Sequence, residues 1–264
     1  RTALLASIAG TIADYRRGMI SAPDSNHVDR WINQFDAAVQ EPILAELDHV
    51  LKKTYISKPE AEKFLSAVLE NSKLAGANPC SFWKDVGPLA IQKGGNSQHE
   101  MLEMFDVLLQ KECDLQVDDC SSSSGTYFYL DDVVFSGNRV KRDLVSWIES
   151  DAPKKAHVHI VVIAFHLNGQ YYANTSIEKA AAKAKKEVEL TWWSCVQFED
   201  RKAYVNASEV LRPSTLPNDP ATQSYLSMLA AAGYPPVLRT SGAMSKSQVF
   251  SSETGRDLLE QEFL

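Results

Sequence analysis

The sequence predicts an α/β fold with a mainly parallel sheet and flanking helices, preceded by a small all-helical region. Up to about residue 85, apolar residues recur at helical spacing, and no stretch has the pattern of a strand. Beyond that point, short apolar and aromatic runs alternate with amphipathic stretches, which is typical of βαβ units and a parallel sheet. We therefore expect a helical N-terminal region at 1–85 and an α/β domain at 86–264.

The N-terminal region should contain several amphipathic helices. An apolar stripe runs through residues 27–55 and meets Pro42 in the middle. Proline is favoured in the first turn of a helix, so we expect Pro42 to begin a second helix there. Residues 57–76 open with Ser and Pro and end at Gly, which are start and stop signals for one further helix.

The second region should supply the strands. The main strand candidates are "GTYFYLDD", "AHVHIVVIAFH" and "LTWWSCVQF", with a shorter apolar piece near residue 90. Helical patterns follow the glycines at 94–95, cover 138–149 and run through "TSIEKAAAKAKKEVE". Gly169 is expected in a turn, with Tyr171 and Tyr172 following it.

The composition is that of an ordinary globular protein. The hydrophobic fraction is 44%, and the formal net charge is −7. An acidic chain of this kind is a poor candidate for broad nucleic-acid binding, and no apolar run is long enough to cross a bilayer. We expect a cytoplasmic protein without a membrane partner. Because the chain starts at Arg1, a targeting signal or a further domain beyond either end stays open.

The four cysteines form no CxxC pair and have no zinc-site spacing. We therefore expect all of them to be reduced, packed thiols. The chain also lacks the G-x-S-x-G motif of serine hydrolases and the G-x-x-x-x-G-K-[ST] motif of phosphate-binding P-loops.

The strongest site signal is the stretch "YFYLDDVVFSGNRV". It places Asp131 and Asp132 where a buried strand ends, and Ser136 and Gly137 just before a helix. Ligands of parallel sheets bind beyond the carboxyl ends of strands, and a helix start behind a Ser-Gly turn offers free amides to an anion. Carboxylates suit hydroxyls or Mg²⁺, so the combination predicts a ribose-phosphate site. The alternative is a structural helix cap.

This stretch resembles the phosphoribosyl-pyrophosphate loop of type I phosphoribosyltransferases. The resemblance implies that Asp131 and Asp132 bind the ribose hydroxyls and Mg²⁺ and form the catalytic pair. It implies a 5′-phosphate site made by Phe135, Ser136, Gly137, Asn138 and Arg139. The family usually has a second Ser or Thr where this chain has Arg139, which either adds charge to the phosphate site or indicates a different ligand.

A second loop, in "AIQKGGNSQHEML", precedes the acid pair. In the same family an earlier loop of this kind holds pyrophosphate through backbone amides. By that resemblance the pyrophosphate site would comprise Lys93, Gly94, Gly95, Asn96, Ser97 and Gln98. The alternative is that the glycines make only a turn.

Most of the chain also resembles the phosphoribosyltransferase-like effectors of bacterial conflict systems, which accompany anti-phage modules such as retrons. The relevant segments are "RWINQFD", "IQKGGNSQ", "YLDDVVFSGNRV", "LTWW" and "FSSETGR". The resemblance implies a ribose-phosphate or nucleotide ligand, and a partner protein or reverse-transcriptase complex. Three roles stay open: an enzyme acting at the anomeric carbon, a non-catalytic nucleotide sensor, and an assembly subunit with a vestigial pocket.

Histidines and aromatic residues give weaker signals. His166 should lie at the carboxyl end of its strand, where it could contact a base or leaving group. His157 and His159 lie at the other end and are better explained as structural residues than as metal ligands. Trp192 and Trp193 should face opposite sides of a strand, so at least one should pack in the core while the other could stack on a nucleobase.

Overall fold

The computed structural model describes residues 1–240 and 249–263. The chain forms two compact units, one made of Arg1–Ser57 with Glu199–Leu264 and the other of Lys58–Phe198. This division differs from the expected boundary at residue 85. Helices between residues 58 and 85 pack with the sheet, and the last third of the α/β region joins the N-terminal helices instead.

The second unit contains a five-stranded, fully parallel sheet, which confirms the predicted fold class. The strands are β1 (Val86–Pro88), β2 (Thr126–Val134), β3 (Lys155–His166), β4 (Glu187–Trp193) and β5 (Val196–Phe198). Their order is β1-β2-β3-β4, and β5 pairs with β3 further along the same edge as β4. The run predicted as one strand near residues 190–198 is therefore two strands separated by a short break.

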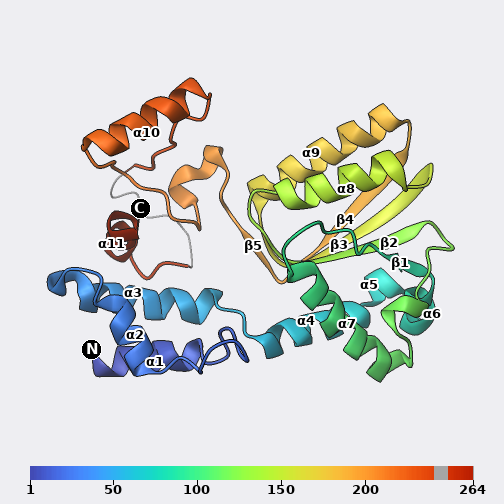
Figure 1. Cartoon of the computed structure of the whole chain (residues 1–264), viewed down its shortest axis with the longest axis horizontal. Helices are drawn as coiled ribbons and strands as arrows, with labels where there is room; N and C mark the ends of the chain where they lie inside the picture. Colours follow the sequence, from blue (N-terminus) through green and yellow to red (C-terminus); the bar gives the residue numbers. More distant parts are fainter. Residues whose placement is uncertain (241–248, 264) are drawn as a thin grey trace. The chain divides into compact units, whose positions relative to one another are not determined.

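Helices cover both faces of this sheet (Figure 1). One face carries α8 (Asn138–Ser150) and α9 (Leu167–Ala184). The other carries α4 (Lys58–Leu69), α5 (Ser72–Ala75), α6 (Pro79–Lys84) and α7 (Ser97–Cys113), with a short 3-10 helix, η1, at Val117–Asp119. Trp192 packs against the first face and Trp193 against the second, as their alternation predicts.

The first unit is helical. It consists of α1 (Thr2–Thr11), α2 (Ser25–Ile32), α3 (Ala37–Thr54), the 3-10 helix η2 (Lys202–Ala207), α10 (Pro220–Ala231) and α11 (Glu253–Phe263). A buried ion cluster secures α11, because Arg239 pairs with Glu253, Asp257 and Glu260. Arg256 also pairs with Glu260, at 2.9 Å.

Two helix predictions were wrong in detail. Pro42 lies inside α3 rather than at its start, since the break falls before Ala37. Burial of Ile43 and Leu44 next to the proline compensates for the backbone hydrogen bond that it cannot donate. Residues 57–76 form two helices rather than one, because the Asn71 side chain accepts a hydrogen bond from the Lys73 amide and caps a new helix.

The turn predicted at Gly169 is also absent, because α9 begins at Leu167 and includes Gly169, Tyr171 and Tyr172. Sequence patterns favoured a turn because glycine is a poor helix former. The close packing of Gly169, described with the site below, accounts for the glycine.

The prediction of four free thiols was wrong. Cys80 in α6 and Cys113 at the end of α7 form a disulfide, with their Cα atoms 5.2 Å apart. Their separation of 33 residues gave no sequence signal, because only the fold brings the two helix ends together. Cys120 is a buried free thiol, and burial raises the pKa of Cys120 to about 11. Cys195 is free and exposed.

None of the helices within residues 1–240 and 249–263 combines the length and the apolar character that a bilayer crossing requires.

Candidate functional site

Asp131 and Asp132 lie near the carboxyl end of β2, as predicted. Both line a cavity of about 300 Å³, which we call the acid-pair cavity. Its other walls come from the turn that follows β2 and from the first residue of α7, Ser97. Asp131 is only 2% exposed, whereas Asp132 is open to solvent.

The buried carboxylate of Asp131 is held from two sides. Its Oδ1 accepts hydrogen bonds from the Ser97 hydroxyl at 2.6 Å and from the Asp132 amide at 3.0 Å. Burial raises the pKa of Asp131 above its usual value; the Ser97 hydrogen bond opposes this rise, and the Asp132 charge adds to it. A cation placed in this cavity would stabilise the ionised form of Asp131 and so oppose this rise in pKa.

The free oxygens of the acid pair suit a divalent cation or sugar hydroxyls. Oδ1 of Asp132 accepts a hydrogen bond from the Val133 amide at 2.6 Å. Within the described part of the chain, Oδ2 of each aspartate accepts no hydrogen bond. That part also holds no group of three metal-binding side chains. Mg²⁺ commonly binds to one or two carboxylates together with substrate phosphates, so the pair fits this ion.

The turn at 135–139 presents backbone amides to the same cavity. Gly137 caps α8 in the left-handed region, with φ of 73°, which glycine adopts without strain. The Asn138 amide points back to the Ser136 hydroxyl at 3.4 Å. Amides in the first turn of a helix have no intrahelical partner, and the helix dipole favours an anion there.

The 135–139 turn is held in place by α9. A side chain at Gly137 would overlap the carbonyl of Gly169, and one at Gly169 would overlap the carbonyl of Phe135. The two backbones therefore touch directly at a pair of glycines. Sequence reasoning missed Gly169, although a glycine inside a helical pattern is a signal of close backbone approach.

The predicted pyrophosphate loop, residues 93–98, which we call the glycine loop, lies next to the acid-pair cavity and contributes Ser97 to its lining. Gly94 and Gly95 both have positive φ, at 90° and 85°. Arg139 donates from Nη1 to the Gly94 carbonyl at 2.9 Å, and a side chain at Gly95 would overlap its guanidinium. Arg139 thus lies across the glycine loop and links the two predicted loops.

Side-chain amides fix the C-terminal part of the glycine loop. Gln98 donates from Nε2 to the Leu130 carbonyl at 3.1 Å, just before the acid pair. Gln92 and Gln98 also exchange hydrogen bonds: each side-chain oxygen accepts from the other residue's backbone amide, at 2.9 and 3.2 Å. This reciprocal pair had not been predicted. Together with the Ser97–Asp131 bond, it ties the start of α7 to the end of β2.

Several predicted residues do not line the acid-pair cavity: Lys93, Gly94, Gly95, Asn96, Gln98, Asn138 and His166. Lys93 lines a separate, neighbouring cavity, and Asn96 donates to Glu100 at 2.9 Å. His166 lies at the end of β3, with its ring 5.2 Å from the ring of Phe135, so it supports the turn without lining the cavity.

The two histidines at the other end of β3 have structural partners. His157 lies 2.8 Å from the Thr191 hydroxyl, and His159 accepts from the Trp193 indole at 3.3 Å. Burial lowers the pKa of His159 to about 4, so this ring is neutral near pH 7.

One of three comparisons with known proteins found a match. No curated protein and no solved structure matches the chain. The PRTase-CE family matches residues 28–264, a range that includes the acid pair, both loops and the whole sheet. The chain therefore belongs to PRTase-CE, a family of phosphoribosyltransferase-like effectors.

Proposed function

We propose that the acid-pair cavity binds a ribose-5-phosphate compound, either phosphoribosyl pyrophosphate or a nucleotide, together with Mg²⁺. The protein then makes or breaks a bond at the anomeric carbon of the ribose. The observation that carries this proposal is that Asp131, Asp132, Ser97 and the turn after β2 line one cavity, with the glycine loop joined to that turn through Arg139.

Each part of the ligand has a matching group. The 5′-phosphate would rest against the turn formed by Phe135, Ser136, Gly137 and Arg139 at the start of α8, where the helix dipole favours negative charge. The ribose hydroxyls would donate to the free Oδ2 atoms of Asp131 and Asp132. A cavity of about 300 Å³ accommodates a sugar phosphate and leaves the leaving group at the glycine loop.

The glycine loop and Arg139 would stabilise the departing group. Breaking the bond at the anomeric carbon leaves positive charge on the sugar and negative charge on pyrophosphate. The two carboxylates would lie near the positive charge on the sugar. The glycine-loop amides and Arg139 would lie near the negative charge on pyrophosphate. Mg²⁺, held through Asp131 and Asp132, would supply further charge neutralisation of the phosphates.

The test is incubation of the protein with labelled phosphoribosyl pyrophosphate, and separately with nucleotides, in the presence of Mg²⁺. We expect release of pyrophosphate or of free base. Both Asp131→Asn and Asp132→Asn should abolish this turnover, because each removes a charge from the pair.

A matched control is Asp118→Asn, which changes an exposed aspartate in the adjacent pair of η1, away from the cavity. This variant should keep full turnover. Turnover that survives in both acid-pair variants would contradict the assignment of these residues.

A second candidate role is a non-catalytic nucleotide sensor. Arg139 favours it, because the guanidinium already donates to Gly94 and lies over Gly95, where the leaving group would otherwise rest. Calorimetry separates the two roles: tight nucleotide binding without product over hours identifies a sensor.

The proposed biological setting is an effector in bacterial anti-phage defence, such as a retron, with a partner protein or reverse-transcriptase complex. Family membership supports this setting. Depletion of a nucleotide pool by the enzyme would stop growth of the infected cell. Expression of the wild-type chain should then lower nucleotide levels in cells, and expression of Asp131→Asn should not.

A further inference from the structure

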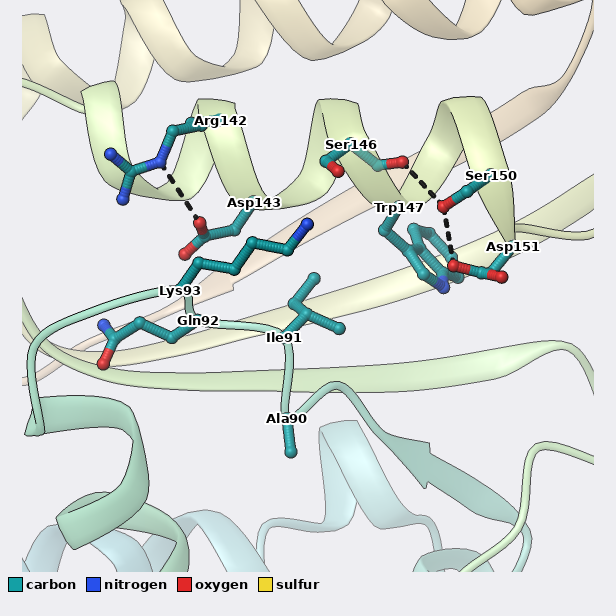
Figure 2. A pocket seen from close by; sticks show the side chains of 10 residues that line it. All are labelled: Ala90, Ile91, Gln92, Lys93, Arg142, Asp143, Ser146, Trp147, Ser150 and Asp151. Atoms are coloured by element: carbon teal, nitrogen blue, oxygen red, sulfur yellow. Dashed lines mark hydrogen bonds and ion pairs between the residues drawn. The ribbon is translucent and has the colours of Figure 1, made fainter.

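A larger cavity lies beside the proposed site and is separate from it. It has a volume of about 690 Å³ and lies between the segment Ala90–Lys93 and the outer side of α8 (Figure 2). We call it the edge cavity, because the chain at Leu89 has just left β1, the edge strand of the sheet. No residue that lines the acid-pair cavity also lines this one.

The half of the edge cavity below the start of α8 carries two cations, Arg142 and Lys93. Figure 2 shows the Lys93 ammonium reaching toward Ile91 and away from the Arg142 guanidinium, with the Asp143 carboxylate between the two. The ammonium of Lys93 makes no hydrogen bond or ion pair within residues 1–240 and 249–263. Arg142 makes only a 3.6 Å ion pair with Asp143, and Asp143 is also engaged by the Tyr129 hydroxyl at 3.0 Å. This half of the cavity therefore has cationic donors available for an anion.

The middle of the cavity is apolar. Ile91 lies on one side and Trp147 on the other. Trp147 is held rigidly, since its ring makes an edge-to-face contact with Tyr127 at 4.9 Å. A fixed aromatic surface beside an aliphatic side chain suits a flat or hydrophobic group.

The far end offers one donor and one acceptor. The Trp147 residue is 6% exposed, yet its indole N–H has no acceptor in the described part of the chain. Asp151 accepts from the Ser150 hydroxyl at 2.6 Å through Oδ2, which leaves Oδ1 without a partner among these residues. The indole nitrogen is not one of the fully buried polar atoms of the described residues, and Asp151 is exposed, so this donor and this acceptor both face the open cavity and are available to a ligand.

We infer that the edge cavity is a second binding site, specific for a nucleoside monophosphate. The phosphate lies at Lys93 and Arg142, and the base lies beside Trp147. The edge of the base or the sugar exchanges hydrogen bonds with the indole N–H and Asp151. The volume suits such a ligand, and the lining supplies cations for the phosphate, the Trp147 ring for the base, and a donor and an acceptor at the Asp151 end.

This second site is in contact with the first through one short segment. Gln92 and Lys93 line the edge cavity, and Gln92 exchanges hydrogen bonds with Gln98 next to Ser97. A bound nucleotide would therefore act on the start of the glycine loop, and the two ligands should alter each other's affinity by the same factor.

The test is titration calorimetry of the Asp131→Asn/Asp132→Asn double variant with AMP, GMP, CMP and UMP, alongside inorganic phosphate and adenosine. At least one nucleotide should bind to this variant, and more tightly than phosphate or adenosine. Arg142→Ala and Asp151→Asn, each added to it, should weaken binding by about tenfold or more, because each removes a charged hydrogen-bonding group.

Lys179→Ala is the matched control for Arg142→Ala, since Lys179 is an exposed cation on α9 outside both cavities. It should leave nucleotide binding unchanged. A second measurement uses the wild-type chain saturated with ribose 5-phosphate and Mg²⁺, which should still bind the nucleotide. Absence of nucleotide binding in both experiments, or binding that is insensitive to Arg142→Ala and Asp151→Asn, would overturn the inference. Neither outcome bears on turnover at the acid pair.

Discussion

The two loops that meet at the acid pair are held in different ways. The 135–139 turn is fixed by backbone packing, because Gly137 and Gly169 bring two main chains into direct contact. The glycine loop has open space around Gly94 and is held by side-chain hydrogen bonds from Gln92, Gln98 and Arg139. The position of the first loop is thus fixed by main-chain packing, and the position of the second depends on a few side-chain hydrogen bonds.

The largest effect should come from a substitution that forces the two main chains apart. Gly137→Ala combines a positive φ with overlap against the Gly169 carbonyl, so it should destabilise the fold by roughly 2–4 kcal/mol. Gly94→Ala also has a positive φ but meets nothing, and should cost only about 1 kcal/mol. Urea unfolding of both variants measures the difference. Equal costs would show that the two loops are held alike.

The next effect tests the residue that joins the loops. Arg139→Ala should weaken binding of pyrophosphate by roughly 1.5–3 kcal/mol, because a charged donor is lost. The change in stability should stay within about 0.5 kcal/mol, since Arg139 is exposed and, among residues 1–240 and 249–263, donates only to the Gly94 carbonyl. Calorimetry and thermal melting provide the two readouts. Unchanged pyrophosphate affinity would place Arg139 outside the ligand site.

A smaller effect distinguishes the two serines of the site. Ser97→Ala removes the hydrogen bond to the buried Asp131 and should cost about 1 kcal/mol of stability. Ser136→Ala changes an exposed hydroxyl at the turn and should leave stability nearly unchanged while weakening phosphate binding. Chemical unfolding of both proteins measures the contrast, and a stability loss confined to Ser136→Ala would reverse our assignment.

Much of this arrangement followed from sequence patterns. The acid pair at the end of a strand, the Ser-Gly turn and the start of α8 at Asn138 all carry local signals: β-propensity, turn residues and helical periodicity. The parallel sheet followed from the alternation of strands and helices.

The remaining features depend on contacts between distant residues. The Cys80–Cys113 disulfide and the Gly137–Gly169 contact each join residues about 30 positions apart. Likewise, the side chain of Lys93 cannot be assigned to a cavity from its loop alone, and the structure places it at the edge cavity. Local patterns give no information on such pairs.

The smallest predicted change concerns stability against pH. Burial raises the pKa of Asp131, so the folded state binds this proton more tightly than the unfolded state does. The contribution of Asp131 to stability is therefore fully present below its unfolded value of 3.8 and is lost as pH rises through the higher folded value. Asp131→Asn cannot lose a proton, so near neutral pH it should be at least as stable as the wild type.

Urea midpoints of the wild type and Asp131→Asn between pH 4 and pH 7 test this sign. The stability of Asp131→Asn relative to the wild type should increase toward neutral pH, even though the variant has lost the proposed activity. An advantage that instead shrinks as pH rises would mean that Asp131 is stabilised as an anion.

The glycine-to-glycine contact also limits how this protein can enclose a substrate. With the main chain after β2 pressed against the first turn of α9, that side of the acid-pair cavity cannot swing inward. The glycine loop, on the opposite side, has room to shift, since Gly94 has open space around it and its carbonyl is bonded only through the Arg139 side chain among the hydrogen bonds described above. A sugar phosphate bound as we propose would therefore be enclosed from the glycine-loop side.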